Sequence, residues 1–213
     1  MIAILDYRAG NLTSVERALN YLEAPCRITD DLQVIRKADR VIFPGVGAAG
    51  ASMENLRELG LDVLLHELFA AGAPIMGICV GLQVLFDHSE ENDTRCLGLL
   101  PGKTRLFPKQ RMLSQNGNQL KVPHMGWNAV SFRGRHPVFR DIPAGSEFYF
   151  VHSYYPEPAD PAHVSGTTEY GISFASAIAL RNLVAMQFHP EKSGAPGLKI
   201  LRNFCTWNGS YSG

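Results

Sequence analysis

The sequence predicts an α/β protein in which helices cover both faces of a parallel sheet, with an antiparallel β-ribbon added in the second half. In the first half of the 213 residues, short apolar segments alternate with helical patterns, the order typical of a parallel sheet. In the second half, strand-like segments are separated by turns rich in Gly, Pro and Asn. No internal repeat interrupts the chain, so we expect one domain over residues 1–213.

Three buried strands organise the first half. Short apolar runs predict them over residues 1–5, 40–43 and 74–78. Apolar residues at helical spacing predict helices that include Val15, Ala18, Leu19 and Leu22, residues 52–71, and residues 80–86. Ligands of parallel sheets gather at the carboxyl ends of the strands, so we expect the functional site where Gly45 and Cys79 follow their strands.

The second half is predicted to be mainly extended. Strand-like composition between turn residues predicts strands over residues 122–132, 147–155, 164–168 and 173–180. A further apolar run over residues 183–186 is interpreted as a buried strand that delivers His189 to the end of the sheet. A closing helix is predicted from the near-helical spacing of Leu198, Leu201 and Phe204.

The composition argues against several classes of partner. The chain has 20 basic and 20 acidic residues, and this zero net charge argues against nucleic acid or an anionic membrane as the main partner. Asp6 and Arg8 interrupt the first apolar run, so no secretory leader is expected. No apolar segment is long enough to span a membrane. We therefore expect a cytoplasmic protein.

The four cysteines form no C-x-x-C pair, so neither a zinc site nor a disulfide framework is expected. Cys26, Cys96 and Cys205 lie in strand-like or apolar contexts typical of inert thiols. Cys79 differs, because it is at the centre of Gly77-Ile78-Cys79-Val80-Gly81, the cysteine form of a G-x-S-x-G nucleophile elbow. In an elbow, a strand turns abruptly into a helix whose N-terminus favours the thiolate. The alternative is a buried structural cysteine.

A thiolate nucleophile needs a base, and His189-Pro190-Glu191 supplies a candidate. Pro190 favours extended backbone at His189, where residues two apart point the same way, so Glu191 is expected to orient the imidazole. The alternative is a surface turn with an incidental ion pair. Of the other histidines, His124 and His152 are expected to be structural. Four are expected to be solvated: His66, His88, His136 and His163.

Acyl transfer also needs hydrogen-bond donors for an oxyanion. The loop Pro44-Gly45-Val46-Gly47 follows a strand, and its glycines permit unusual backbone orientations. We expect an amide of Val46 or Gly47, together with the amide of Val80, to form the oxyanion hole. The alternative for this loop is a tight strand-to-helix turn, and it lacks the Gly-Lys-Ser/Thr of a phosphate loop.

Three segments resemble the signatures of class I (triad) glutamine amidotransferases: residues 44–47, 77–83 and 188–191. Four further segments, which span nearly the whole chain, resemble the glutaminase subunits of imidazole glycerol phosphate synthase: residues 6–12, 123–128, 148–154 and 189–193. The resemblance implies a flavodoxin-like three-layer α/β fold with an added antiparallel β-ribbon. It also implies that Cys79, His189 and Glu191 form the catalytic triad.

The resemblance implies a heterodimer with a (β/α)8-barrel cyclase, which uses the ammonia to make imidazole glycerol phosphate and an aminoimidazole carboxamide ribotide. This reaction belongs to histidine biosynthesis and feeds purine biosynthesis. The residues implied to bind glutamine are Gln83, Glu91 and Ser153. Those implied to lie near the partner are Asn11, Trp127 and Lys192. No metal or organic cofactor is implied.

Three positions depart from the family pattern. Val80 and Leu82 replace the commoner Leu and Met, and Arg8 stands where the family usually has glycine. Arg8 falls in a loop expected to face the cyclase, which leaves open a paralogous amidotransferase that supplies another synthase, for example in surface-sugar amidation. A non-catalytic regulatory subunit, and a cysteine peptidase or chaperone of the same fold, are further alternatives. Glutaminase assays with and without candidate cyclases separate these functions.

Overall fold

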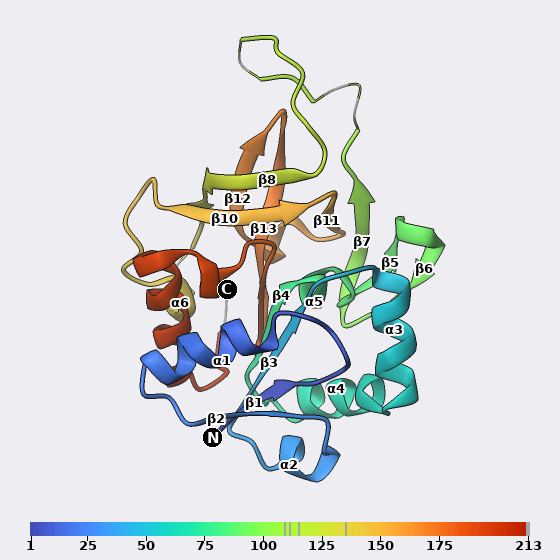
Figure 1. The fold of residues 1–213 in the computed structure, drawn as a ribbon, viewed down its shortest axis with the longest axis vertical. Helices are drawn as coiled ribbons and strands as arrows, with labels where there is room; N and C mark the ends of the chain where they lie inside the picture. Colours follow the sequence, from blue (N-terminus) through green and yellow to red (C-terminus); the bar gives the residue numbers. More distant parts are fainter. Residues whose placement is uncertain (109, 111, 115, 135, 212–213) are drawn as a thin grey trace.

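The computed structural model describes residues 1–108, 110, 112–114, 116–134 and 136–211. This part of the chain centres on an eight-stranded mixed sheet (Figure 1). The strand order is β2 (Cys26–Thr29), β1 (Ile2–Leu5), β3 (Arg40–Gly45), β4 (Ile75–Cys79), β14 (Leu183–Met186), β13 (Ile172–Leu180), β12 (Val164–Tyr170) and β9 (Ser131–Phe132). The first five strands run parallel, and the last three continue the sheet by antiparallel pairing.

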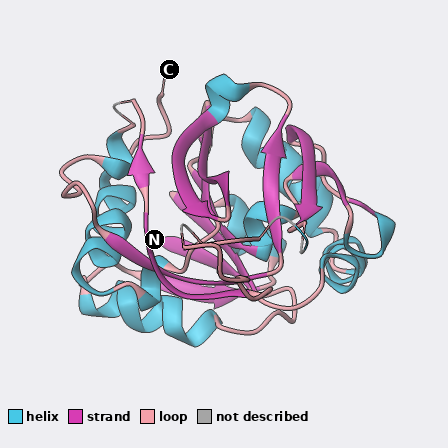
Figure 2. Cartoon of the chain, turned by 90° about the horizontal axis from the view of Figure 1, so that it is seen from above, coloured by secondary structure: helices cyan, strands magenta, loops and turns pink. Residues whose placement is uncertain are grey.

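Helices cover both faces of the parallel strands. They are α1 (Leu12–Tyr21), α2 (Leu32–Arg36), α3 (Ala49–Glu58), α4 (Leu61–Ala70), α5 (Val80–Gln83) and α6 (Gly194–Thr206). α1 packs with α6, whereas α2 and α3 pack with α4. Figure 1 shows α1 and α6 on one side of the strands and α3 and α4 on the other, as right-handed crossovers require. Figure 2 shows the helices flanking the strands from above.

Coverage on both faces explains the composition of the parallel strands. β1, β4 and β14 are buried at every position, so each reads as a continuous run of apolar or small residues without polar alternation. The core follows the sheet without a break and includes the apolar faces of the surrounding helices. The sheet therefore provides a rigid support for a functional site at the carboxyl ends of β3, β4 and β14.

Two smaller sheets complete the fold. One pairs β8 (His124–Ala129) with β10 (Glu147–His152), and both run across the upper half of the molecule in Figure 1. The other has the order β11 (Tyr154–Pro158), β7 (Leu100–Leu106), β5 (Phe86–Ser89) and β6 (Thr94–Arg95). Ser153 joins β10 to β11, so it lies where the chain passes between the two sheets. Short 3-10 turns occur at η1 (Glu91–Asp93), η3 (Pro137–Phe139), η4 (Pro161–His163) and η5 (Pro190–Lys192).

Two predictions of local structure were wrong. The helix predicted over residues 52–71 is two helices, α3 and α4, separated at Gly60, whose φ of +68° is left-handed. The helix predicted over residues 80–86 ends at Gln83, because the chain from Phe86 onward pairs as β5 with β7. The predicted antiparallel ribbon is confirmed: β8 pairs with β10, and β12 and β13 extend the central sheet.

Two further observations concern membrane-spanning helices and disulfide bonds. In the described part of the chain, no helix is both long and apolar enough to cross a membrane. Each of the four cysteines, all within the described residues, is a free thiol.

Candidate active site

Cys79 occupies a sharp strand-to-helix turn. It is the last residue of β4, it is buried, and its φ of 55° and ψ of −110° are unusual for a side-chain-bearing residue. Two glycines permit this turn. A Cβ at Gly81 would overlap the carbonyl oxygen of Phe43, and a Cβ at Gly77 would lie 2.9 Å from Leu85 Cδ1. The turn therefore has the nucleophile-elbow geometry predicted for residues 77–81.

His189 follows β14, the strand beside β4, so the sheet brings His189 and Cys79 to the same edge. The backbone amide of His189 donates to the Tyr149 carbonyl at 2.9 Å, and the Ser193 hydroxyl donates to the His189 carbonyl at 2.6 Å. His189 Nδ1 lies 2.8 Å from Glu191 Oε1, and both side chains are fully buried. Since a carboxylate only accepts, Nδ1 carries a proton. Nε2 has no hydrogen-bond partner among the described residues.

The surroundings of His189 favour its charged form. Burial alone lowers its pKa, but the hydrogen bond to Glu191 and the charge interactions with Cys79 and Glu191 outweigh burial and raise the pKa to about 10. A protonated imidazole beside a cysteine is the charge pattern that supports a thiolate nucleophile. The same proton is then available for a leaving group.

Asn11 contacts the triad directly. Its Nδ2 donates to Glu191 Oε1 at 2.6 Å, from the turn that precedes α1. The resemblance assigned Asn11 to the partner interface, and the structure adds a contact with the carboxylate that orients His189. Since Glu191 Oε1 accepts from both Asn11 and His189, its position is restrained from two directions.

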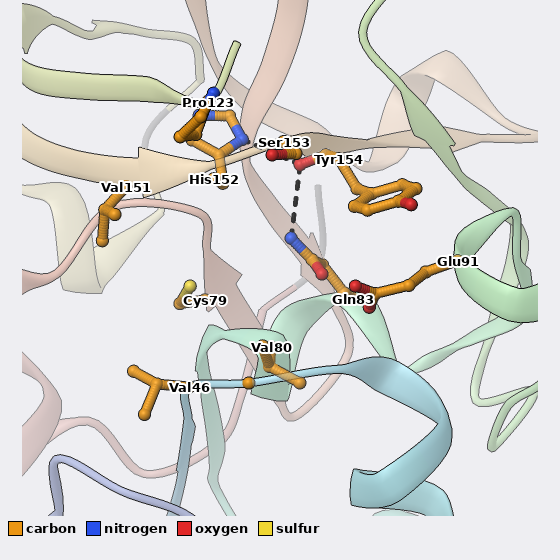
Figure 3. Close-up of a pocket in the computed structure, with 11 residues that line it drawn as sticks. Val46, Cys79, Val80, Gln83, Glu91, Pro123, Val151, His152, Ser153 and Tyr154 are labelled. Atoms are coloured by element: carbon orange, nitrogen blue, oxygen red, sulfur yellow. Dashed lines mark hydrogen bonds between the residues drawn. The ribbon is translucent and has the colours of Figure 1, made fainter.

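The candidate oxyanion donors line the pocket that contains Cys79. Val46, Gly47 and Val80 line the same pocket as Cys79, and Figure 3 shows the labelled valines beside the cysteine. Gly45 pairs with Cys79 across β3 and β4, which places the loop next to the elbow. Gly47 has a φ of +114°, which favours glycine. Val80 is the first residue of α5, where a backbone N–H has no acceptor within its helix.

The pocket also contains all three predicted glutamine-binding residues. It has a volume of about 390 Å³ and is lined by Gln83, Glu91 and Ser153 in addition to Cys79, a size suited to a small metabolite. Gln83 Nε2 donates to the Tyr154 carbonyl at 3.2 Å, the bond drawn in Figure 3. The Glu91 carboxylate accepts from the Ala49 amide at 2.7 Å and faces the same cavity. The ammonium of an amino acid suits such a carboxylate.

Sequence reasoning missed Gln187, which contacts the nucleophile. Its Nε2 lies 3.6 Å from Cys79 Sγ, and its Oε1 accepts from Gln83 at 3.0 Å. The one sequence signal for Gln187 is its position two residues before His189, because residues two apart in an extended segment point to the same side. One histidine prediction was also wrong. His136 is only 1% exposed, because it packs against Phe139, Trp207 and Tyr211 instead of facing solvent.

Two of the predicted interface residues share one surface. Trp127 is 54% exposed on β8, and its ring contacts that of Tyr149 edge to face at 6.2 Å. Lys192 is exposed, with Nζ 6.0 Å from the centre of the Tyr149 ring. The structure thus places Trp127 and Lys192 around one aromatic ring, close to the backbone that carries Glu191.

In the described residues, no group of three or more His, Cys, Asp or Glu side chains could hold a metal ion. The fold and the cysteine–histidine–glutamate site are those of an enzyme that transfers acyl groups through a cysteine. The family model for class I glutamine amidotransferases matches residues 3–207. The chain belongs to this class.

Sequence relatives show to which family within class I the chain belongs. The imidazole glycerol phosphate synthase subunit HisH of Maridesulfovibrio salexigens is 52% identical over 204 residues, which cover 96% of this chain and 95% of that protein. The subunit of the same name in Pseudomonas putida is 49% identical over 212 residues, 99% of each chain. Within class I, the chain is a member of the HisH family.

Solved structures agree on the fold. A crystal structure of a glutamine amidotransferase has a TM-score of 0.71 at 16% identity and covers 95% of this chain and 98% of its own. The structure of a GMP synthase subunit from Thermoplasma acidophilum has a TM-score of 0.66 at 21% identity, covering 96% and 91%. At these identities the likeness concerns the fold alone.

Proposed function

We propose that this chain is the glutaminase subunit of an imidazole glycerol phosphate synthase, which hydrolyses glutamine to glutamate and ammonia for histidine biosynthesis. The observation that carries the proposal is a buried Cys79 that lines a pocket and lies on the strand next to the His189–Glu191 pair, in a chain of the HisH family. Histidine biosynthesis is a cytoplasmic process, and we place the protein there.

Glutamine binds with its amide carbon next to Cys79. Glu91 supplies the negative charge that the substrate ammonium requires, and Gln83 and Ser153 contribute polar groups to the same wall. The amide end then lies against Val46, Gly47 and Val80. This placement leaves the scissile bond at Cys79, whose strand lies next to the strand that His189 follows.

The first half-reaction transfers the acyl group to sulfur. The Cys79 thiolate attacks the side-chain carbonyl carbon, a C–S bond forms, and the carbonyl π electrons move to oxygen. Backbone amides of Val80 and of the Val46–Gly47 loop stabilise this oxyanion. When the intermediate collapses, the C–N bond breaks and His189 Nε2 protonates the departing nitrogen, so that ammonia leaves and a thioester remains.

The second half-reaction hydrolyses the thioester. Neutral His189 takes a proton from water, and the resulting hydroxide attacks the thioester carbon to give a second oxyanion. Collapse breaks the C–S bond, releases glutamate and returns the thiolate beside a protonated His189. Glu191 orients the ring throughout through Nδ1, and Asn11 holds Glu191.

The partner in this proposal is a (β/α)8-barrel cyclase that forms a heterodimer with this chain and consumes the ammonia. The names of the relatives support it, because they are subunits of a synthase. We infer that the surface of Trp127, Tyr149 and Lys192 belongs to the interface, since large exposed aromatic groups anchor such contacts.

Arg8 lies in the loop that precedes α1. Its φ of 63° is one that glycine adopts readily, and its guanidinium binds Glu58 on α3 at 2.7 Å. Both side chains are 60% exposed, so it is the 52% and 49% identity to HisH subunits, and not this ion pair, that argues against a different synthase.

The test separates ammonia production from ammonia use. In the reconstituted complex, Cys79→Ala should abolish glutamine-dependent synthesis and leave ammonium-dependent synthesis at the wild-type rate, because the cyclase site is on the other subunit. Both rates should be measured in the same preparation with saturating ammonium as the control. Equal loss of both would mean that Cys79 is structural.

A further inference from the structure

Two buried histidines that are not members of the triad contact each other. His124 of β8 and His152 of β10 face each other across the strand pair, with His124 Nδ1 3.0 Å from His152 Nε2. They are only 2% and 5% exposed, and the chemistry above uses neither. Burying two imidazoles is costly unless every ring nitrogen has a partner, so the pattern of their hydrogen bonds is informative.

The hydrogen bonds allow only one arrangement of protons. His152 Nδ1 lies 2.8 Å from the Tyr154 carbonyl, which only accepts, so Nδ1 carries the proton. In a neutral ring Nε2 is then an acceptor, and His124 Nδ1 must donate to it. His124 Nε2 is an acceptor in turn, facing the Asn128 amide nitrogen at 3.3 Å. That amide also donates to the Glu169 carbonyl at 2.9 Å, which fixes its orientation.

Burial supports the same assignment. It lowers the pKa of His124 to about 4 and that of His152 to about 3, so both rings are neutral near pH 7. Ring stacking also restrains His124. His124 stacks between Phe150, at 4.8 Å, and Tyr170, at 3.9 Å between ring centres. Rotation out of the hydrogen-bonded arrangement would displace these rings.

The chain of hydrogen bonds connects two functional parts of the molecule. One end is the Tyr154 carbonyl, which also accepts from Gln83 in the glutamine pocket, and His152 itself lines that pocket. The other end is Asn128 on β8, the strand whose outer face exposes Met125 and Trp127 by 63% and 54%. A displacement of β8 therefore either moves His152 and Tyr154 with it or breaks a buried N–H···N bond.

We propose that the His124–His152 pair positions the Ser153–Tyr154 wall of the glutamine pocket relative to β8, so that glutamine affinity depends on the placement of that strand. The two histidines are positioning residues, since they act through Tyr154 and Gln83. This role rests on the glutaminase function proposed above, although the hydrogen-bond arrangement itself does not.

The arrangement is tested by nuclear magnetic resonance on the wild-type full chain, labelled with 15N in histidine. At about pH 7, both rings should appear as neutral Nδ1–H tautomers, with a scalar coupling between the nitrogens across the N–H···N bond. The His124 signals are assigned by their loss in His124→Phe, and the His152 signals by their loss in His152→Phe. A charged ring, an Nε2–H tautomer or absent coupling would overturn the proposal, whatever the enzyme activity.

The consequence for binding is tested by steady-state kinetics in the complex. His124→Phe keeps an aromatic ring between Phe150 and Tyr170 but removes both nitrogens. We expect KM for glutamine to rise about tenfold while kcat changes less than about twofold, because a buried polar group loses its partner without any change at Cys79.

His136→Phe is the matched control, because it also replaces a buried histidine but lies against Trp207 and Tyr211. Its KM should stay at the wild-type value. Equal KM increases in the two variants, or a fall in kcat with unchanged KM, would overturn the positioning role. A wild-type complex that hydrolyses no glutamine would instead refute the proposed function, and the spectrum would still test the pair.

Discussion

Cys79 differs from the other three cysteines in its surroundings more than in its burial. Burial raises the pKa of Cys96 to about 11 and raises the pKa values of Cys26 and Cys205 as well, which keeps these thiols protonated and unreactive. Cys79 alone of the four lines the pocket of Gln83 and Glu91 and lies beside the protonated His189. Reactivity should follow these surroundings.

Labelling should therefore be selective. A glutamine-like diazo-ketone should modify Cys79 and leave Cys26, Cys96 and Cys205 free, since only Cys79 combines a substrate pocket with a histidine base. Peptide mapping by mass spectrometry measures the distribution of the label, with excess glutamine as the protecting control. Label found mainly on another cysteine would contradict the assignment of the nucleophile.

At the scale of elements, the loop between β1 and α1 contacts both halves of the catalytic machinery. A Cβ at Gly45 would overlap the buried Tyr7 hydroxyl, and one at Gly10 would lie 2.8 Å from Val46 Cγ2. At the end of this loop, Asn11 binds Glu191. Three packed segments, the loop, the β3–α3 turn and η5, therefore position the base and the oxyanion donors together, which explains why the glycines cannot be exchanged freely.

The elbow should be especially sensitive to added side-chain volume. Gly81→Ala places a Cβ on the Phe43 carbonyl, so we expect either a shifted Cys79 and a loss of activity of at least about 100-fold or a destabilised fold. Thermal unfolding and glutaminase rates distinguish these results. Gly50→Ala, in α3, is the control, because its Cβ would make an ordinary 3.4 Å contact with Thr94. Comparable activity of the two variants would contradict the close-packing argument.

For the whole molecule, turnover is expected to depend on the partner. A cyclase that binds Lys192 restrains the adjoining Glu191, and docking against Trp127 presses on β8. We predict slow hydrolysis by the isolated chain, on the hypothesis that the loop from Gly45 to Gly47 presents its amide only when the partner binds. An oxyanion hole that lacks one donor loses about two to three orders of magnitude in rate. Lys192→Ala should reduce the activation by the partner more than it reduces the basal rate.

Ammonia release by wild type and Lys192→Ala, each alone and with saturating partner, measures this coupling. Lys199→Ala is the matched control, since Lys199 is also a partly exposed lysine but lies on α6 and pairs with Asp141 within the chain. Full-rate hydrolysis by the isolated wild type would mean that the enzyme needs no activation.

The stability of the whole fold should fall in acid. Burial lowers the pKa values of His124, His136 and His152 to about 4, 4 and 3, so the unfolded chain takes up protons first as pH drops below about 6.5. Each buried histidine then removes up to about 1.4 kcal/mol of stability per pH unit until its folded pKa is reached. His189 acts oppositely, since its pKa is raised, and its contribution is lost progressively as the pH rises from about 6.5 to about 10.

Urea unfolding at several pH values between about 7.5 and 5 measures the slope of the unfolding free energy against pH. His136→Phe should make this slope shallower, because unfolding then takes up about one proton fewer, and it should leave the pocket unchanged. A slope that this variant leaves unchanged would contradict the burial argument.

Much of the parallel core and the triad was predictable because the signals are local. Strands buried on both faces are continuous apolar runs, and the elbow and the His189-Pro190-Glu191 segment each carry their chemistry within a few residues. The family resemblance then supplied Gln83, Glu91 and Ser153, which the fold brings into one pocket. The expectation of one domain over residues 1–213 stays a prediction.

The sequence by itself therefore determined the chemistry: a thiol on an elbow, a histidine with its carboxylate, and a glycine-rich loop on the neighbouring strand. Only the tertiary structure decided that Gln187 contacts Cys79, that Asn11 holds Glu191 180 positions away, and that His124 pairs with His152. Such contacts depend on which distant segments pack together. Local periodicity reports the buried face of a segment but carries no information about the residue that will cover it.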